Sequence, residues 1–124
     1  MDSIYDRIGG EVAVRRLVDR FYDLMGQDPA FRPLREMHPE DLTDSRRKLF
    51  MFLSGWLGGP NLYVQAHGHP RLRLRHLPFA VDEAARDQWM QCMTQAMVDV
   101  GIPEPLRDEL HKAFYRTADF MRNQ

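Results

Sequence analysis

Cysteine is nearly missing from this 124-residue chain, which contains Cys92 and no other thiol. A single cysteine excludes an internal disulfide framework and any zinc site built mainly from thiolates. Long apolar runs are missing as well, because no stretch approaches the ~18 consecutive apolar residues that a membrane span requires. The first ten residues carry acidic side chains and no apolar segment typical of a signal sequence. We therefore expect no membrane association and a cytoplasmic protein.

An excess of charge of either sign is also lacking. The 17 Lys and Arg residues nearly balance the 18 Asp and Glu residues, for a formal net charge of −1. This balance gives no general attraction to phosphate backbones, and Arg71, Arg73 and Arg75 form too short a basic stretch to change that. We expect no nucleic-acid partner and interpret Arg71 and Arg73 as surface charge. The composition, 44% apolar and 28% charged, is that of an ordinary globular protein, and the length predicts a single domain over residues 1–124.

Apolar residues recur at helical spacing along most of the chain, and the Gly and Pro clusters fall between the periodic runs. The pattern predicts an all-α fold. Its expected helices are a short one around 4–8, one through 14–25 closed by Gly26, one capped by Thr43 or Asp44 that stops at 58–60, a long one from Asp82 to Gly101, and a last one that begins near Pro105.

The segment 71–76 has the sequence RLRLRH, which alternates with the period of a β-strand. A lone strand has no pairing partner in a chain whose other segments are helical. We therefore expect a short helix or turn that Pro78 ends. Pro29 and Pro33 limit the segment after the second helix to short turns, and His69 is expected to cap a turn with its imidazole.

Familiar catalytic patterns are absent from the sequence. It has no paired carboxylates, Ser/His/Asp arrangement, Gly-rich phosphate loop or HExxH motif, so hydrolysis and phosphoryl transfer have no visible apparatus. The histidines remain as candidates for chemistry, and spacing alone distinguishes none of them. One hypothesis is a zinc site, because imidazole and thiolate both suit zinc. Its candidate ligands are His67, His69, His76 and Cys92, although the usual paired spacing is missing.

A longer motif carries a family resemblance. Residues 58–79 contain the pattern GGPxLYxxxxGHPRLRLRHLPF, and the segments DQW at 87–89 and CM at 92–93 follow it. Together with supporting segments from residue 4 to about residue 121, this motif resembles the group II truncated haemoglobins. The resemblance implies a truncated globin-like, two-over-two helical sandwich that encloses haem b.

The same resemblance assigns the iron ligand to His76, the histidine of the Arg-His-x-Pro-Phe motif. A neutral imidazole is a good ligand for haem iron. Arg75, Lys48 and Tyr63 match positions that bind the haem propionates, since these need cations or hydroxyls at the pocket mouth. Further cofactor contacts are expected from Leu49, Phe52, Leu53 and Phe79.

On the opposite face of the haem, the resemblance implies a diatomic ligand such as O₂, NO or CO beside Tyr22 and Trp89. A phenolic O–H and an indole N–H both donate hydrogen bonds to a ligand with partial negative charge, which slows its dissociation. His38 matches a position where the family varies among Phe, Tyr and His, and its ordinary pKa of ~6.5 predicts pH-dependent ligand affinity. Ser45, beside Leu49, replaces the distal histidine of larger globins and leaves an open path to the iron.

Two donors favour retention of O₂ over its release. We therefore expect redox or detoxifying work, such as NO oxidation or a peroxidase-like reaction, with an unknown reductase as partner; oxygen transport is the less favoured role. Two other classes stay open, namely a helical interaction or regulatory domain that has lost haem, and a zinc-binding domain. The sequence leaves a monomer and a homodimer equally open.

Overall fold

The structure is a computed structural model that describes residues 3–124. In chain order its elements are α1 (Ile4–Ile8), α2 (Gly10–Gln27), the 3-10 turn η1 (Pro29–Phe31), α3 (Arg32–Glu36), α4 (Thr43–Trp56), α5 (Leu62–His67), α6 (Leu72–His76), α7 (Glu83–Asp99) and α8 (Leu106–Phe120). No strand occurs between residues 3 and 124, so the predicted all-α class is confirmed. None of the helices described is both long and apolar enough to cross a membrane.

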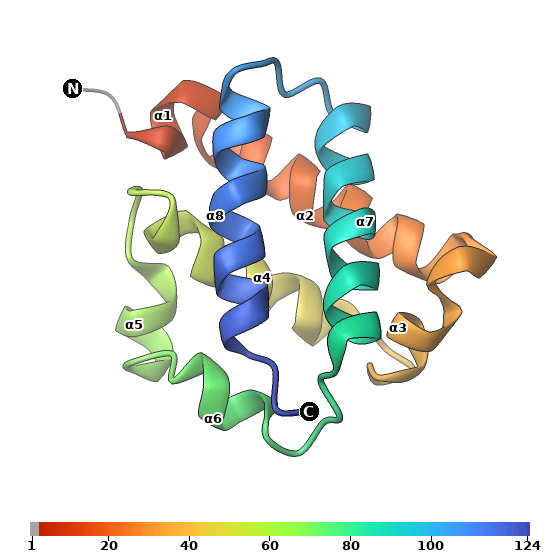
Figure 1. The fold of residues 1–124 in the computed structure, drawn as a ribbon. Helices are drawn as coiled ribbons and strands as arrows, with labels where there is room; N and C mark the ends of the chain where they lie inside the picture. Colours follow the sequence, from red (N-terminus) through yellow and green to blue (C-terminus); the bar gives the residue numbers. More distant parts are fainter. Residues whose placement is uncertain (1–2) are drawn as a thin grey trace.

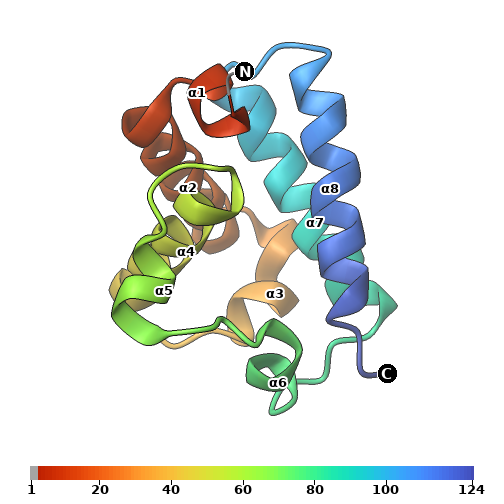
Figure 2. The ribbon, with the colours of Figure 1, turned by 90° about the vertical axis from the view of Figure 1, so that its left-hand side faces the viewer.

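Two pairs of long helices make up the body of the fold. α7 and α8 run side by side in opposite directions, and α2 and α4 lie behind them in the view of Figure 1. α2 contacts both α4 and α7, which joins the two pairs. In the second view, α6 lies at the opposite end of the molecule from α1, near the C-terminus (Figure 2). This is the predicted two-over-two sandwich.

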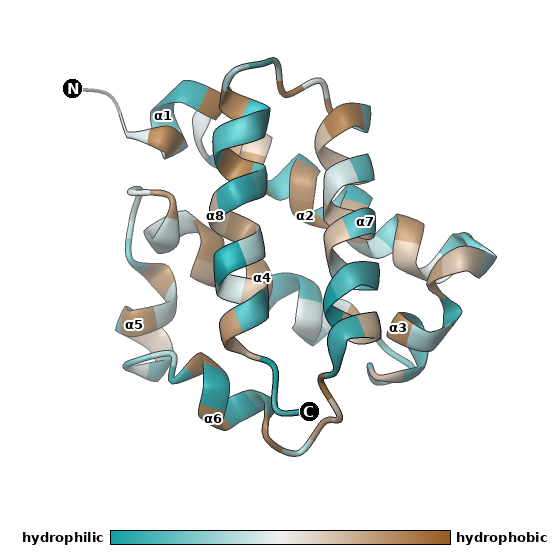
Figure 3. Cartoon of the chain, in the orientation of Figure 1, coloured by the Kyte–Doolittle hydropathy of each residue, from teal (hydrophilic) through white to brown (hydrophobic). Residues whose placement is uncertain are grey.

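The core is built from apolar side chains that repeat at helical spacing, so each long helix buries one face. Brown, hydrophobic residues accordingly recur along α2, α7 and α8 (Figure 3). The largest fully buried side chains are Phe21, Leu17, Met25, Leu53, Met93, Met97 and Leu110. One continuous cluster links these residues with partly buried aromatic side chains, including Trp56 and Trp89.

The predicted boundaries of α7 are confirmed. The Asp82 carboxylate accepts a hydrogen bond from the Ala85 N–H at 2.8 Å, which satisfies one free donor of the first turn. Just after the helix, Gly101 adopts a left-handed conformation with φ of 83°. Its N–H donates to the carbonyl of Val98, as in the glycine-terminated end common to helices.

Two other helix boundaries differ from the prediction. α2 does not stop at Gly26 but continues to Gln27, because Gly26 keeps a helical conformation and Pro29 disfavours helical geometry at the residue before it. Neither Thr43 nor Asp44 caps α4. Thr43 is instead its first helical residue, and its N–H donates to the carboxylate of Asp41 at 2.9 Å.

Some of the short helices and turns were predicted from the sequence and one was not. The segment 71–76 forms the predicted short helix, α6, and the expected turns after α2 are η1 and α3, with Pro33 in the first turn of α3. α5 was not predicted. It is six residues long and lies between two glycine-containing segments, too short for a periodic signal.

Candidate functional site

A cavity of about 550 Å³ lies between the two helix pairs, and residues from α2 to α8 line it. Its lining is rich in aromatic and aliphatic side chains, with a few polar groups, as in sites that bind small hydrophobic ligands. Every residue that the sequence analysis proposed as a cofactor or ligand contact lines this one cavity: Tyr22, His38, Ser45, Lys48, Leu49, Phe52, Leu53, Tyr63, Arg75, His76, Phe79 and Trp89.

His76, the last residue of α6, presents a ring nitrogen with a free lone pair. Its Nδ1 donates a hydrogen bond to the carbonyl oxygen of Leu72 at 2.6 Å. A carbonyl oxygen only accepts, so Nδ1 carries a proton, and in the neutral imidazole that binds metals the lone pair is on Nε2. Histidines that ligate metals characteristically have this arrangement, because the second hydrogen bond fixes both the tautomer and the ring plane. The residue therefore fits an axial ligand of haem iron.

Asn123, just after α8, holds the end of α6 in place. Its side-chain amide donates to the carbonyl oxygens of His76 at 3.3 Å and Phe79 at 2.8 Å. Its side-chain oxygen accepts the N–H of Val81 at 3.0 Å. Sequence reasoning missed this residue, because its role depends on a contact between distant segments that no local pattern signals.

The other end of α6 is held by a local turn. The N–H of Arg71 donates to Nδ1 of His69 at 3.1 Å, so the predicted turn cap at His69 is confirmed. Arg71 itself has a left-handed backbone, with φ of 48°. Few residues other than glycine adopt this conformation, and here the histidine contact helps to hold it.

Tyr22 brings a hydroxyl donor from α2 to the cavity. The side chain is buried and lines the cavity, and its hydroxyl forms no hydrogen bond within residues 3–124, so it is free to donate to a bound ligand. Burial raises the pKa of Tyr22 above its ordinary value of 10.0, although the Arg46 guanidinium acts in the opposite direction. The phenol therefore keeps its proton at neutral pH and remains a donor.

His38 lies beside Tyr22 and offers an acceptor. Its Nδ1 donates to the carbonyl oxygen of Leu34 at 2.9 Å, which leaves Nε2 with its lone pair. Burial lowers the pKa of His38 below its ordinary value of 6.5, the hydrogen bond to the Leu34 carbonyl acts against this, and the positive charge of Arg35 acts in the same direction as burial. The imidazole is therefore neutral at pH 7.

Aromatic neighbours fix the position of Trp89 in α7. Its ring centroid lies 5.3 Å from that of Phe21 and 5.6 Å from that of Phe114. Phe114 in turn stacks on Trp56 at 5.0 Å. No acceptor for the indole N–H of Trp89 occurs among the described residues. The N–H is not among the fully buried polar atoms that lack a partner, and Trp89 lines the cavity. The indole is thus held by packing while its donor stays free for a ligand.

Cations lie at the opening of the cavity. The Lys48 ammonium is 3.0 Å from the Asp44 carboxylate in an exposed pair along α4. The Arg75 guanidinium lies 5.6 Å from the centre of the Tyr63 ring. Exposed cations beside an apolar interior suit a flat hydrophobic group that carries carboxylates at one edge.

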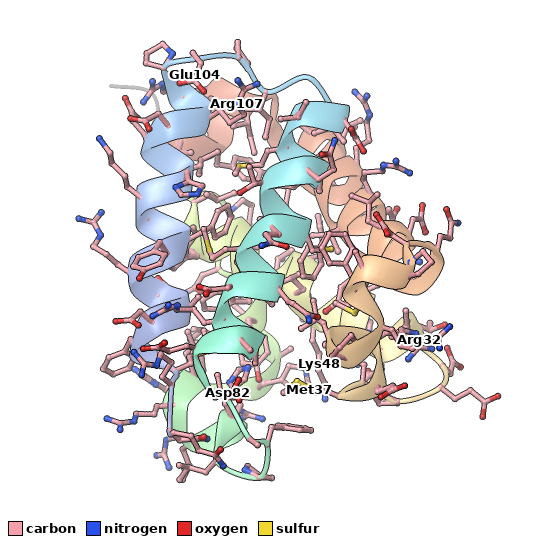
Figure 4. All side chains as sticks on the ribbon, turned by 45° about the vertical axis from the view of Figure 1, so that its right-hand side comes forward. Arg32, Met37, Lys48, Asp82, Glu104 and Arg107 are labelled. Carbon is pink, nitrogen blue, oxygen red and sulfur yellow. The ribbon has the colours of Figure 1, made fainter. Side chains whose placement is uncertain are left out.

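Several lining residues were not proposed from the sequence. They are Leu34, Met37, Pro39, Asp44, Trp56, Leu72, Val81, Ala85, Arg86, Phe114, Thr117, Ala118 and Met121. Of these, Met37 is labelled in Figure 4, as is Lys48, and both line the cavity. Helical periodicity marks Trp56 and Phe114 as inward-facing, which was the available signal, but it does not tell a cavity wall from a packed core.

The zinc hypothesis is not supported by the geometry. No group of three or more His, Cys, Asp or Glu side chains placed to hold a metal ion is found in residues 3–124. Cys92 is buried in α7, where its thiol donates to the carbonyl oxygen of Phe21 at 3.2 Å. His67 and His69 are exposed at the surface. The four proposed ligands therefore do not come together.

The comparisons with known proteins identify the family of the chain. A family model described as bacterial-like globin matches residues 3–123. The chain belongs to the bacterial-like globin family. It is 42% identical over 120 residues to the group 2 truncated haemoglobin YjbI of Bacillus subtilis, covering 97% of this chain and 88% of that protein.

Solved structures place it more closely among two-over-two globins. A cold-adapted truncated haemoglobin from Pseudoalteromonas haloplanktis superposes with a TM-score of 0.95 at 46% identity, over 99% of both chains. A group II two-on-two haemoglobin from Agrobacterium tumefaciens gives 0.96 at 40% identity, over 100% of this chain and 96% of that one. This globin is therefore a haem b protein that binds diatomic ligands, and the alternative of a haem-free interaction domain is not favoured.

Proposed function

We propose that His76 holds the haem through Nε2, and that Tyr22 and Trp89 donate hydrogen bonds to a ligand on the other side. The observation that carries this proposal is the bond from Nδ1 of His76 to the Leu72 carbonyl, which leaves Nε2 available. When bound, haem supplies the iron at which a diatomic ligand binds.

The other lining residues would contact either the porphyrin ring or its propionates. Leu49, Phe52, Leu53 and Phe79 line the cavity and would contact the porphyrin and exclude water from it. Arg75, Lys48 and Tyr63 bind the propionates. Ser45 is a small residue in the first half of α4, and it leaves room for a ligand to enter from solvent.

Two free donors on one side of the cavity favour slow release of O₂. Each hydrogen bond contributes ~1 kcal/mol or more, so together they slow dissociation by about one to two orders of magnitude. A truncated haemoglobin from Bacillus subtilis described as oxygen-avid is 41% identical to this chain, with a TM-score of 0.89, which supports the same behaviour here.

Slow release suits consumption of the ligand rather than its transport. We infer a redox role in the cytoplasm, such as oxidation of NO by retained O₂ or reaction with peroxide, carried out by a single domain of residues 1–124. Such a role needs a reductase that returns the iron to its ferrous state.

Titration of the purified chain with haem tests the proposal. We expect saturable uptake at one haem per chain, followed by slow loss of O₂ from the ferrous protein in stopped-flow mixing. A folded chain that does not take up haem contradicts the proposal, and so does rapid O₂ loss that is unchanged in a Tyr22→Phe, Trp89→Phe double variant.

A further inference from the structure

Charge is unevenly distributed along the chain, and one segment has basic residues and no acidic ones. Residues 61–81 contain no aspartate or glutamate, although the whole chain carries a net charge of −1. The basic residues in this stretch are His67, His69, Arg71, Arg73, Arg75 and His76. Arg71, Arg73 and Arg75 form no ion pair within residues 3–124, whereas most other cations of the structure do.

Large apolar side chains lie among these cations. Leu74 is 57% exposed and Leu77 55% exposed, and their spacing puts them on one face of α6 together with Arg73. Phe120 of α8 is 62% exposed, and the Arg73 guanidinium lies 5.9 Å from the centre of its ring. We call Arg71, Arg73, Leu74, Leu77, Phe79 and Phe120 the α6 face.

The α6 face lies directly over the cavity. The other side of the same helix presents Leu72, Arg75 and His76 to the cavity. Phe79 belongs to both surfaces, since it lines the cavity and is 44% exposed. In Figures 1 and 2, α6 forms the outer edge of the molecule, away from the paired long helices. Only one short helix therefore separates a partner on this face from the proposed haem ligand.

We propose that the α6 face is the docking surface for an acidic protein that donates single electrons. The inference rests on the proposed function, because a ferric haem must gain one electron before it binds O₂. The partner supplies that electron from a reduced [2Fe–2S] cluster or flavin, which is oxidised by one electron, and no covalent bond forms or breaks. Small apolar centres ringed by charge are typical of such transient redox contacts.

Charge selects this partner over a second copy of the chain. A symmetric dimer built on the α6 face brings Arg71 and Arg73 of both subunits into one small interface, and residues 61–81 supply no acidic side chain to offset their repulsion. An acidic surface instead meets unpaired guanidinium groups, which steer its approach and are screened by salt.

A plant-type [2Fe–2S] ferredoxin, which is strongly acidic, serves as the probe. The ¹⁵N-labelled, CO-bound holoprotein is titrated with it, and we expect amide shifts to change around residues 71–79 and 120, with weaker binding as salt is raised. Arg71→Glu with Arg73→Glu weakens binding about 10-fold at low salt. Arg16→Glu with Arg32→Glu, exposed residues of α2 and α3, makes the same change in net charge and alters binding less than about 2-fold.

A second readout separates docking from electron acceptance. The double variant at Arg71 and Arg73 slows reduction of the ferric protein by reduced ferredoxin, while reduction by dithionite keeps its rate. Leu74→Ser with Leu77→Ser weakens ferredoxin binding and leaves its salt dependence intact, because the charged rim is unchanged.

Four results overturn the inference while leaving haem binding untouched. These are shift changes elsewhere on the protein, an equal effect of the control variant, concentration-dependent dimerisation through the α6 face, and tighter binding of this face to phosphatidylglycerol vesicles than to ferredoxin. The absorption spectrum of each variant is recorded first. Absence of haem from the unmodified protein contradicts the proposed function itself, whereas any of the four results obtained with haem-loaded proteins contradicts only the docking inference, so the two failures are distinguishable.

Discussion

The ring of Tyr22 meets the ring of His38 edge to face, with centroids 5.9 Å apart. Burial acts on the two groups in opposite directions, since it raises the pKa of the phenol and lowers the pKa of the imidazole. Both are therefore uncharged at pH 7. The cavity thus has one hydrogen-bond donor and one acceptor next to each other on the same wall.

Removal of the Tyr22 hydroxyl should speed the loss of O₂. Tyr22→Phe keeps the ring and its edge contacts with Phe21 and His38, and it removes only the hydroxyl donor. A lost hydrogen bond of ~1 kcal/mol or more corresponds to a rise of about 5- to 10-fold or more in the dissociation rate. Stopped-flow mixing of the oxygenated ferrous protein with excess CO measures that rate.

Tyr115→Phe is the matched control, because Tyr115 is exposed on α8 and lies outside the cavity lining. Its dissociation rate should equal that of the unmodified protein. Equal rates in Tyr22→Phe and in the unmodified protein would show that the phenol does not contact the ligand.

The neutral state of His38 links stability to pH. Its pKa is below 6.5 in the folded protein, so the unfolded chain takes up this proton first as the pH falls. The stabilising contribution is complete above the ordinary pKa and is lost progressively below it. Urea unfolding of the CO-bound protein is measured at about pH 7.5 and about pH 5.5. The free energy of unfolding should fall less between these two pH values for His38→Phe than for the unmodified protein.

The other ionisable groups are common to both proteins in this comparison, so the difference between the two losses isolates His38. His111→Phe is the control, since His111 is exposed on α8. If the free energy of unfolding falls as much in His38→Phe as in the unmodified protein, the buried imidazole is not the group that titrates.

Asn123 should affect how tightly the cofactor is held, without contacting it. Asn123→Ala removes the side-chain bonds to the carbonyls of His76 and Phe79 and to the N–H of Val81. The end of α6 then moves more freely, so haem transfer to an excess of haem-free myoglobin should be several-fold faster. Gln124→Ala is the control at the next residue, and an unchanged transfer rate in Asn123→Ala would contradict the anchoring role.

Cys92 should resist alkylation in the folded protein. Burial raises the pKa of its thiol to about 12, and the thiol donates to the Phe21 carbonyl. At pH 8 about one molecule in ten thousand then carries the reactive thiolate. Mass spectrometry after iodoacetamide treatment should show an unmodified chain in buffer and one added group in urea. Rapid modification in buffer would indicate that α7 opens readily.

Gly and Pro positions made most of the fold predictable, because these residues limit backbone geometry whatever surrounds them. Asp82 and Gly101 mark the two ends of α7 as expected. Gly26 misled the prediction, since glycine permits a helix end without requiring one, and Pro29 set the actual stop. α5 escaped notice because a single short helix contains too few turns for a period to emerge.

The site followed from motif similarity more than from residue chemistry. Spacing alone did not separate His76 from the other histidines, whereas the surrounding motif did. The structure adds what one sequence cannot contain, namely the tautomer set by the Leu72 carbonyl and the contacts of Asn123 across the fold. The roles of Tyr22 and Trp89 stay predictions until their variants are measured.

The absorption spectrum of His76→Gly, recorded with and without added imidazole, tests the central claim most directly. The substitution opens a space at the end of α6 that free imidazole can enter. We predict loss of the ferric and CO-bound spectra of the unmodified protein, and their return when imidazole is added. Unchanged spectra in His76→Gly without imidazole would show that the iron is held by a different residue.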